Sequence, residues 1–415
     1  MRHVIIGGSI AGISAAKAIR AADAKAEITI LSEEKSRPYY RPMITFLIRK
    51  QDLDITFEDD LEKKYGLTFI PERAGSIDVM KKKVMPASGR SIAYDRLLIA
   101  TGSSPVIPEV PGINGQGVFA MRTAEDALAV KTSADRSKAA VILGGGLAGI
   151  KSAIALKKYG LDVTIVEKLD GLLSRGFDRR GAEIISKILR NGGLHLLTGD
   201  SISEVVRDEG KIKAVNLSSG RALHADLVIV AVGACPNLEL AKDSGIKTNK
   251  GILINENLLT SVPDVYAAGD VVEYTDLVTG MPAVSALWTN AEEMGRLAGR
   301  NMAGAGLKYQ GFFSVLNSTE IFDVPVMAVG LIDPDPADKN YEVVIEDNID
   351  SYKKLVFRGS ILAGAVFINN VENAGIYTNL IRNRIPIGPL KEEAIKGSLR
   401  YINFIRTVPE QVLIA

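Results

Sequence analysis

Cysteine is almost absent from this chain, with Cys235 alone among 415 residues. One thiol excludes an internal disulfide, and it excludes any metal or iron–sulfur site built from the chain's own thiolates. This composition favours a reducing compartment, so we expect a cytoplasmic protein. Cys235 follows an apolar strand in the phrase GACPN, a position typical of a small buried packing residue rather than of a nucleophile.

Long hydrophobic runs and an excess of one charge are also lacking. No apolar stretch approaches the length of about 18 residues that a membrane span needs, and the first apolar strand starts too close to Met1 for a signal peptide. Lys and Arg number 50 against 49 Asp and Glu, which indicates no general affinity for nucleic acid or anionic membranes. The three histidines, His3, His195 and His224, are too scattered to suggest a metal site or a catalytic base.

Glycine, by contrast, is concentrated in two related phrases, VIIGGSIAG at residues 4–12 and VILGGGLAG at residues 141–149. Each phrase predicts a strand, a glycine turn and the start of a helix. In that arrangement backbone N–H groups approach a pyrophosphate closely, and the positive end of the helix stabilises its charge. Two such fingerprints predict two bound dinucleotides. The expected binding residues are Gly7, Ser9, Ile10, Ala11 and Gly12 in the first fingerprint and Gly144, Gly146, Leu147, Ala148 and Gly149 in the second.

Acidic residues follow each fingerprint where a ribose is expected. The phrase DVTIVE predicts a buried strand that ends in Glu167, at about the 20-residue spacing of a ribose-binding acid. After the first fingerprint the strand EITIL leads to Glu33 and Glu34, slightly later than usual. Either glutamate could bind the first ribose, and we favour Glu34. A carboxylate at Glu167 accepts from a 2′-hydroxyl and repels a 2′-phosphate, which predicts NADH rather than NADPH; Lys168 directly after it weakens that preference.

The repeated phrases divide the chain into an α/β protein with two Rossmann-like dinucleotide-binding domains and a C-terminal α+β domain. YDRLLIATGSSP and ADLVIVAVGACPN close the two units alike, and a Pro- and Gly-rich linker covers residues 105–115. Beyond a predicted helix at 288–302, short strands (VPVMAVG, YEVVIED, KKLVFRG, ILAGAVFIN) and a helix near 374–384 predict an antiparallel third domain that serves as an interface. The predicted domains are 1–110 and 241–310 for the first unit, 111–240 for the second, and 311–415 for the third.

The order and spacing of these phrases, including VYAAGD at residues 265–270, resemble the FAD-dependent pyridine nucleotide-disulfide oxidoreductases over nearly the whole chain. The resemblance implies FAD in the first unit and NADH in the second, with Asp270 of the GD motif binding the flavin ribityl chain or pyrophosphate. PYYRP at residues 38–42 and the C-terminal segment look most like NADH:rubredoxin oxidoreductases and the flavin domain of NADH-dependent nitrite reductases. Arg41 would then lie beside the pyrophosphate; the alternative is a surface charge after a proline turn. The other cofactor-binding residues expected are Pro42, Ala74, Ala100, Thr101, Gly102, Gly269, Trp288, Lys168 and Gly233.

Two positions depart from that family. Many relatives carry a lysine five residues after the arginine and a glutamate two residues after the last fingerprint glycine, and these meet near the reactive edge of the flavin. Here the two positions hold Phe46 and Lys151. Lys151 is either a lone cation that stabilises reduced flavin or a solvated helix residue. Trp288 is either a residue that shields the flavin ring or an ordinary core aromatic.

The missing cysteines decide the functional hypothesis. Disulfide reductases of this family place redox cysteines beside the flavin, whereas this chain has SRPYYRP there. We therefore expect an NADH-oxidising flavoprotein that exchanges electrons, in either direction, with an iron–sulfur or other metalloprotein such as rubredoxin, ferredoxin or a partner subunit, as a homodimer or as part of a redox complex. The alternatives are a peroxide, persulfide or CoA-disulfide reductase using Cys235, an NADH:quinone reductase anchored through LRYINFIR, and a non-catalytic flavoprotein module.

Overall fold

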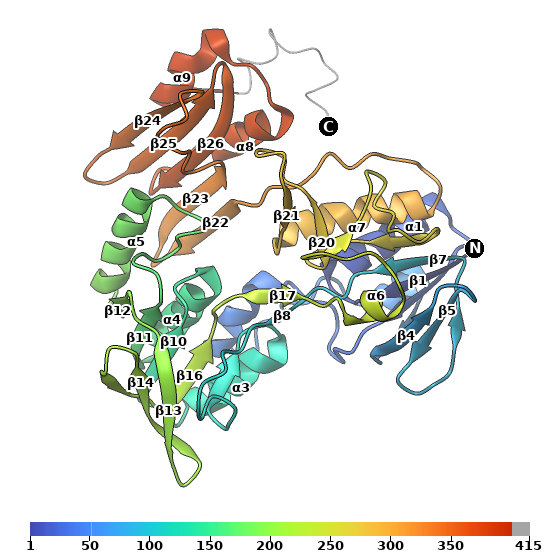
Figure 1. Cartoon of the computed structure of the whole chain (residues 1–415), viewed down its shortest axis with the longest axis horizontal. Coiled ribbons are helices and arrows are strands. Elements are labelled where there is room, and N and C mark those ends of the chain that lie inside the picture. Colours follow the sequence, from blue (N-terminus) through green and yellow to red (C-terminus); the bar gives the residue numbers. More distant parts are fainter. Residues whose placement is uncertain (51, 401–415) are drawn as a thin grey trace.

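The computed structural model describes residues 1–50 and 52–400, which form three units (Figure 1). The first unit is built on a parallel five-stranded sheet of order β19-β7-β1-β2-β3. Its strands are β1 (Arg2–Ile6), β2 (Glu27–Leu31), β3 (Leu67–Ile70), β7 (Arg96–Ile99) and β19 (Val265–Ala267). The pairing of β19 with β7 brings a segment from late in the chain into the N-terminal sheet.

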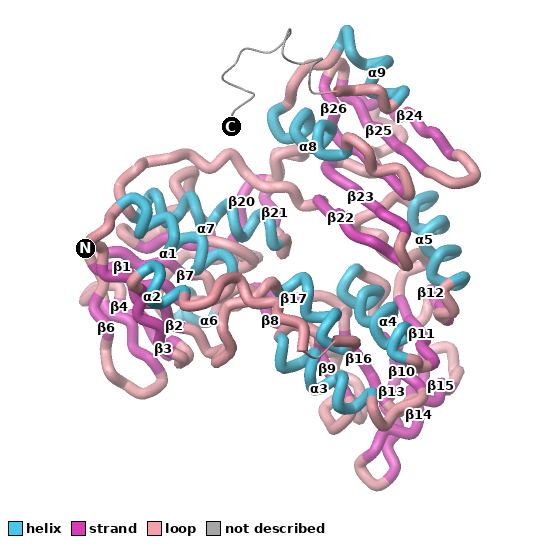
Figure 2. The backbone as a smooth tube through the Cα atoms, turned by 180° about the vertical axis from the view of Figure 1, so that it is seen from behind, coloured by secondary structure: helices cyan, strands magenta, loops and turns pink. Residues whose placement is uncertain are grey.

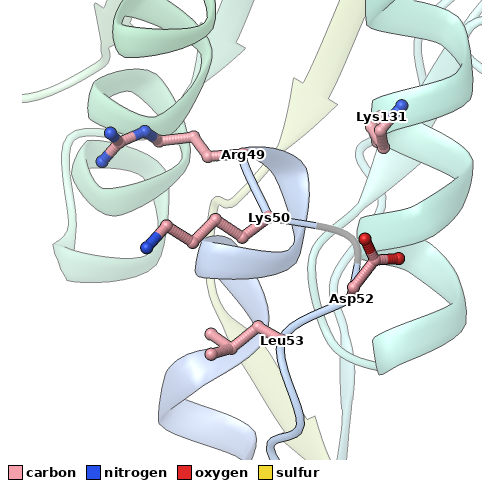
Figure 3. Close-up of a pocket in the computed structure, with 5 residues that line it drawn as sticks. All are labelled: Arg49, Lys50, Asp52, Leu53 and Lys131. Carbon is pink, nitrogen blue, oxygen red and sulfur yellow. The ribbon is translucent and has the colours of Figure 1, made fainter.

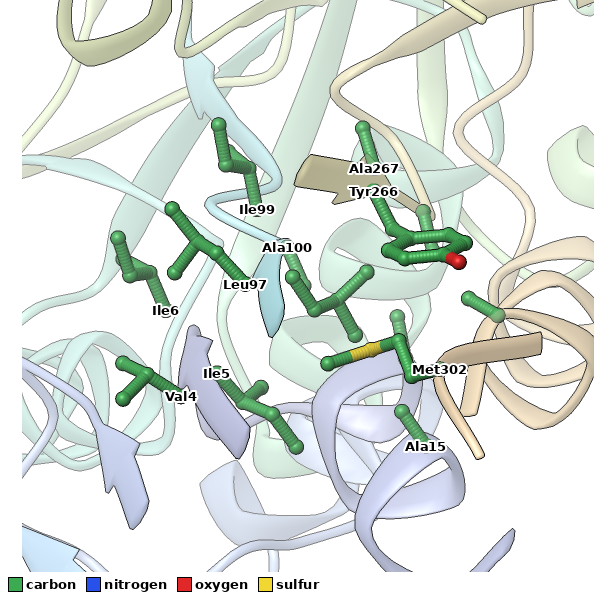
Figure 4. Close-up of a cluster of buried hydrophobic side chains, with 14 of the residues drawn as sticks. Val4, Ile5, Ile6, Ala15, Leu97, Ile99, Ala100, Tyr266, Ala267 and Met302 are labelled. Carbon is green, nitrogen blue, oxygen red and sulfur yellow. The ribbon is translucent and has the colours of Figure 1, made fainter. Parts of the chain in front are cut away.

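The core of this unit follows from continuous apolar strands, as expected for a parallel sheet covered on both faces. Val4 and Ile5 on β1 and Leu97 and Ile99 on β7 are at most 1% exposed. Helices α1 (Ile10–Ala22) and α7 (Trp288–Met302) cover this sheet side by side, and Met302 reaches into the same apolar cluster (Figure 4). The helix predicted at 288–302 is thereby confirmed.

Helices α1 and α7 pack more closely than ordinary side chains allow. A Cβ atom added to Gly295 would lie 2.1 Å from the carbonyl oxygen of Ala11, and one added to Gly299 would lie 2.3 Å from that of Ala15. Neither distance is possible for a real Cβ, so both glycines of α7 are required by the position of α1. Nothing in the sequence around Gly295 and Gly299 predicted this contact.

The second unit repeats the plan with a parallel sheet of order β12-β11-β10-β16-β9. Its strands are β9 (Val118–Ala120), β10 (Ala139–Leu143), β11 (Asp162–Glu167), β12 (His195–Thr198) and β16 (Leu227–Val230), and its helices are α3 (Ala124–Ala134), α4 (Leu147–Tyr159) and α5 (Arg179–Asn191). An antiparallel sheet adds β13 (Ile202–Asp208), β14 (Lys211–Leu217) and β15 (Ala222–His224). The strand predicted to end in Glu167 is confirmed.

Two short strands carry the chain between these units. β8 (Ser103–Pro105) runs toward the second unit, β17 (Ala234–Pro236) returns from it, and the two pair antiparallel between the units (Figure 2). The boundary predicted at residue 240 falls inside α6 (Glu239–Asp243), and Leu238 before that helix packs in the core of the first unit. The return to the first unit is therefore made at β17.

The third unit is an antiparallel sheet of order β22-β23-β26-β25-β24 with two helices. Its elements are β22 (Leu316–Ile321), β23 (Val324–Gly330), β24 (Tyr341–Asp347), β25 (Tyr352–Arg358), β26 (Ile361–Ile368), α8 (Ala374–Asn383) and α9 (Lys391–Lys396). The four predicted strands and the helix near 374–384 are confirmed, whereas β22 was not predicted. One face of this sheet packs against the second unit near α5, so that the two units share an apolar core (Figure 1).

Smaller elements complete the described chain. They are η1 (Arg41–Ile48), α2 (Leu61–Tyr65), β4 (Ala74–Asp78), β5 (Lys83–Pro86), β6 (Ile92–Ala93), β18 (Ile252–Leu253), β20 (Val272–Thr275), β21 (Pro282–Val284) and η2 (Gly388–Leu390). Among the described helices, none is long and apolar enough to cross a membrane. Most of the segment LRYINFIR, from residue 401 onward, lies outside the described residues.

Candidate functional site: a cleft between the three units

A cleft of about 1300 Å³ lies where the three units meet. Most of the residues predicted to bind cofactors line it: Ser9, Ile10, Ala11, Arg41, Pro42, Ala100, Gly102, Gly144, Gly146, Leu147, Ala148, Lys151, Glu167, Lys168, Gly233, Gly269, Asp270 and Trp288. The tertiary structure thus brings both fingerprints and the GD motif to one cavity. The predicted residues that do not line it are Gly7, Gly12, Glu33, Glu34, Ala74, Thr101 and Gly149.

The first fingerprint forms a turn that only glycine can make. Gly7 has a φ of +120°, and its N–H donates to the carbonyl of Leu31 at 2.8 Å. A Cβ at Gly7 would lie 2.1 Å from the oxygen of Ala100, and one at Gly12 would lie 1.9 Å from the oxygen of Gly7. These glycines act by close packing behind the turn rather than by lining the cleft. The side chain of Ser9 does not cap α1, so the first N–H groups of that helix are free to bind an anion.

The second fingerprint repeats this geometry. Gly144 has a φ of +108°, a Cβ there would lie 2.3 Å from the oxygen of Ala231, and one at Gly149 would lie 2.1 Å from the oxygen of Gly144. Helix α4 begins after Gly146, which has no side chain to cap it. In both units the glycines thus allow close backbone packing behind the turn, and each turn faces the cleft with uncapped helix N–H groups. This geometry fits two pyrophosphates.

The acids after the two fingerprints are not equivalent. In the second unit Leu143 pairs with Val166, so Glu167 is the first residue of β11 past its pairing with β10, and its carboxylate accepts from the N–H of Gly145 at 2.6 Å. In the first unit Ile6 pairs with Leu31, which puts Ser32 at the corresponding position.

Glu33 and Glu34 lie one and two residues beyond Ser32. The carboxylate of Glu34 accepts from Arg41 and from the hydroxyl of Tyr39, both at 2.5 Å. The position of both glutamates beyond Ser32 accounts for the late spacing seen in the sequence. The choice between the two glutamates stays a prediction.

Arg122 belongs to the site although the sequence analysis missed it. Its Nη2 donates to Oδ2 of Asp270 at 3.0 Å, and the hydroxyl of Ser103 donates to the same oxygen at 2.9 Å. Arg41 donates to the carbonyl of Arg122 at 2.5 Å. Both arginines and Asp270 line the cleft, so two cations and one carboxylate are held together beside the first fingerprint. The sequence carried one signal for Arg122: this residue directly precedes Thr123, which caps α3 in a capping box.

Trp288 lines the cleft with an unsatisfied polar group. Its indole Nε1 is buried and has no hydrogen-bond partner among the described residues. A buried donor without an acceptor is costly, so this N–H fits a bound ligand that supplies the acceptor. Tyr40 and Phe57 lie 5.8 and 6.5 Å away, centroid to centroid, and pack around the indole ring. Of the two interpretations of Trp288, the geometry favours a residue that faces the cofactor.

The two positions that depart from the resembled family differ in whether they line the cleft. Lys151 lies on α4, is half-buried and lines the cleft, and burial lowers the pKa of its ammonium group. It is therefore not a freely solvated helix residue. Phe46 lies on η1, is 45% exposed and is not among the residues that line the cleft.

The expectation of a buried Cys235 is wrong. Cys235 is exposed on β17, opposite Ser104 of β8, and it is not among the residues that line the cleft. The two-stranded ribbon crosses between the units and leaves the side chain of Cys235 uncovered, whereas Ser103 of β8 is buried beside Asp270. No described side chain of the cleft is a thiol.

A second, smaller pocket lies beyond the C-terminal end of η1, beside α3 (Figure 3). It is lined by Arg49, Lys50, Asp52, Leu53 and Lys131, and none of these residues lines the large cleft. Arg49 and Lys50 point in the same direction. Because it shares no lining residue with the cleft, it is a separate feature of the surface.

Comparison with known proteins supplies the family. The sequence signature described as "Pyridine nucleotide-disulphide oxidoreductase" matches residues 1–295, and that of the "Rubredoxin NAD+ reductase C-terminal domain" matches residues 316–385. This chain belongs to the pyridine nucleotide-disulphide oxidoreductases. It is an FAD-dependent NAD(P)H oxidoreductase, and its cofactors are FAD and NADH. FAD supplies the chemistry of accepting a hydride from NADH and returning electrons in pairs or singly.

Two relatives of this oxidoreductase match most of its length. The NADH oxidase of Methanocaldococcus jannaschii is 35% identical over 347 residues, covering 80% of this chain and 76% of the relative. Subunit epsilon of the NADH-dependent phenylglyoxylate dehydrogenase of Aromatoleum evansii is 31% identical over 408 residues, covering 96% and 95%. In contrast, the chain spans about half the length of two Bacillus subtilis relatives, a nitrate reductase electron transfer subunit and a nitrite reductase (48% and 49%).

Two solved structures share the whole architecture. The NAD-dependent persulfide reductase of A. fulgidus has a TM-score of 0.88 at 27% identity, covering 94% of this chain and 79% of that one. The NADH:rubredoxin oxidoreductase of Clostridium acetobutylicum has a TM-score of 0.76 at 29% identity, covering 96% and 99%. These proteins use different acceptors on one fold, so the acceptor must be argued from the site.

The geometry of Arg122 predicts a measurable effect on FAD binding. We expect Arg122→Met to weaken FAD binding about tenfold, because it removes a charge-assisted hydrogen bond to Asp270. Titration of FAD into the apoprotein, followed by flavin fluorescence, measures this. Arg136→Met, at the exposed end of α3, is the matched control. Equal FAD affinity in the two variants would show that Arg122 has no part in the FAD site.

Proposed function

We propose that this oxidoreductase passes electrons from NADH, by way of FAD, to an iron–sulfur or other metalloprotein such as rubredoxin, ferredoxin or a partner enzyme subunit. The observation that carries the proposal is the absence of a thiol among the described residues that line the cleft. A disulfide or persulfide substrate needs a thiolate to attack it and to relay electrons. A one-electron metal centre needs only to approach the flavin closely enough for electron transfer.

Different residues of the chain have different roles in this reaction. The uncapped starts of α1 and α4 bind the two pyrophosphates, Glu167 binds a ribose, and Arg41, Arg122 and Asp270 hold the FAD end of the cleft. Lys151 supplies a cation near the position where hydride transfer is expected. NADH delivers two electrons, so two molecules of a one-electron carrier are reduced for each NADH oxidised. The same site can run in reverse when the metal centre has the lower potential.

The comparisons support this acceptor class without naming one protein. The third unit matches the C-terminal domain of rubredoxin NAD+ reductase, and the relative matched over nearly its full length is by name a dehydrogenase subunit. A chain that serves as a fixed subunit would meet its acceptor inside the complex. We therefore include a partner subunit, together with rubredoxin and ferredoxin, among the acceptors to test.

Persulfide reduction is the second candidate, because the A. fulgidus enzyme shares the fold so closely. That candidate would have to use the exposed Cys235, since the cleft itself offers no thiol among its described residues. A Cys235→Ser variant separates the two. Full loss of NADH-dependent turnover in this variant would support the persulfide reductase. Unchanged NADH-dependent turnover supports metalloprotein reduction.

Rapid-reaction kinetics test the proposal directly. The holoprotein is reduced anaerobically with one equivalent of NADH and then mixed with rubredoxin, ferredoxin, CoA disulfide, a quinone or oxygen while the flavin absorbance is followed. We expect reoxidation by an iron–sulfur protein to be at least about tenfold faster than by the other acceptors, in the parent and in Cys235→Ser alike. Faster reoxidation by CoA disulfide or a quinone would contradict the proposal, and failure of NADH to reduce the flavin would favour a non-catalytic module.

A further inference from the structure

A buried ionic cluster joins the second unit to the third. Asp178 and Lys354 are each 5% exposed, and Tyr352 is 1% exposed. Lys354 Nζ lies 3.3 Å from Oδ2 of Asp178, and the hydroxyl of Tyr352 donates to the same oxygen at 2.6 Å. Lys354 also reaches Asp333 at 3.2 Å. A buried charge is tolerated only when it is paired and hydrogen-bonded, so the cluster holds the two units in one arrangement.

Asp178 occupies a defined position in the second unit. It is the N-cap residue of α5, and its side chain accepts from the N–H of Gly181 at 3.3 Å. Tyr352 and Lys354 lie on β25 of the third unit, on the face that packs against α5. The cap of a helix in one unit is therefore held by side chains of another.

The segment that leads into Asp178 forms one wall of the cofactor cleft. Leu169, Leu173, Ser174, Arg175 and Gly176 all line the cleft. At its middle the segment is tied to the second fingerprint, where the N–H of Leu173 donates to the carbonyl of Gly145 at 3.0 Å. Segment 169–177 thus runs from the fingerprint to the ionic cluster.

The backbone of this segment depends on its anchors. Leu173 has a φ of +54°, a left-handed conformation that residues other than glycine rarely adopt, and its side chain is buried in the core shared by the second and third units. Such a conformation is strained and persists only where the surroundings enforce it. Asn317 of β22 packs directly beside Gly176, so the third unit also touches the segment from within the cleft.

We infer that Lys354 is a positioning residue for NADH: by pairing with Asp178 it fixes segment 169–177, so that the third unit sets the affinity of the cleft for the coenzyme. The inference rests on the proposed assignment of the second fingerprint to NADH. It gives the third unit a part in the flavin reduction step, in addition to any part in partner binding. Lys354 touches no reacting atom and acts only through Asp178.

The test is Lys354→Met, measured on the FAD-loaded protein. We expect the dissociation constant for NAD⁺, a non-reducing probe, to rise about tenfold by calorimetry. The apparent dissociation constant for NADH in anaerobic flavin reduction should rise equally, with the limiting rate within twofold. The FAD content and visible spectrum should be unchanged. Lys353→Met is the matched control: Lys353 is the neighbouring residue on β25, but it contacts Glu346 and the carbonyl of Ile395 inside the third unit.

Asp178→Asn/Lys354→Met guards against a variant that fails to fold. It removes both charges and keeps a good N-cap residue, and we expect its dissociation constant for NAD⁺ to rise more than twofold above that of the parent but less than in Lys354→Met. NAD⁺ affinity within twofold of the parent in either variant, whether or not the melting temperature falls, overturns the inference; a lower melting temperature would then leave the cluster only a link between units. Because these measurements need no electron acceptor, failure to reduce any metalloprotein would count against the proposed function alone. A parent protein that binds no NAD⁺ overturns the inference itself.

Discussion

Replacing Gly295 with alanine should release FAD from the protein and lower its free energy of unfolding by about 3 kcal/mol. The added Cβ would lie 2.1 Å from the carbonyl oxygen of Ala11, and backbone atoms cannot move aside as a flexible side chain can. Overpacking of this kind costs about 1–3 kcal/mol and sometimes more. Helix α1 must then shift away from α7. Since α1 starts at the first fingerprint, its shift moves the N–H groups expected to bind the pyrophosphate.

The matched control for this variant is Gly375→Ala. Gly375 also lies in a helix, α8, but it is exposed and a Cβ there would meet nothing within 4 Å. We expect this variant to keep its FAD and to gain up to about 1 kcal/mol, since alanine is the better helix former. Urea unfolding and the ratio of flavin absorbance to protein absorbance measure both effects. Normal FAD content in Gly295→Ala would mean that α1 tolerates the shift and that the close packing is not needed for binding.

The second large effect concerns coenzyme choice at Glu167. We expect Glu167→Gln to reduce the preference for NADH over NADPH by at least about tenfold, measured as the ratio of kcat/KM values for flavin reduction. The carboxylate of Glu167 repels a 2′-phosphate, and like charges brought together cost several kcal/mol. Lys168 and Arg175 line the same cleft and would pair with that phosphate once the carboxylate is gone.

Glutamine is the informative substitution because Glu167 also supports the local backbone. Its carboxylate accepts from the N–H of Gly145 at 2.6 Å and of Leu169 at 2.8 Å, and a glutamine oxygen can keep one of these bonds. Glu204→Gln, on β13 outside the cleft, removes the same charge and should leave the preference unchanged. An unchanged preference in Glu167→Gln would show that another residue selects NADH.

The first fingerprint shows which features of this protein could be predicted from local sequence. The glycine turns, the strands before them and the helices after them depend on residues within a few positions of one another, and a positive φ or a close backbone approach leaves a mark in the sequence. The strand ending in Glu167 and the helix Trp288–Met302 were predictable for the same reason. The family resemblance rests on these same local phrases.

Contacts between distant segments could not be predicted from local sequence. Arg122 looked like an ordinary residue before a helix cap, and only the approach of the GD motif, 148 positions away in sequence, gives it Asp270 as a partner. Lys354 occupies one position in an apolar strand, and only packing against α5 turns it into a buried ion. Cys235 was expected to be buried because it follows an apolar strand, but the ribbon that carries it crosses between units and leaves it exposed.

Local sequence and composition were enough to predict two nucleotide-binding turns, a third antiparallel unit and too few thiols for a disulfide relay, because each of these is a local or compositional property. The tertiary structure alone decided that all three units line one cleft, that Gly295 and Gly299 bring α7 against α1, and that Lys354 is linked to the coenzyme wall through Asp178. Such features depend on which surfaces meet when apolar faces are buried together, and residues far apart in sequence carry no local sign of that meeting.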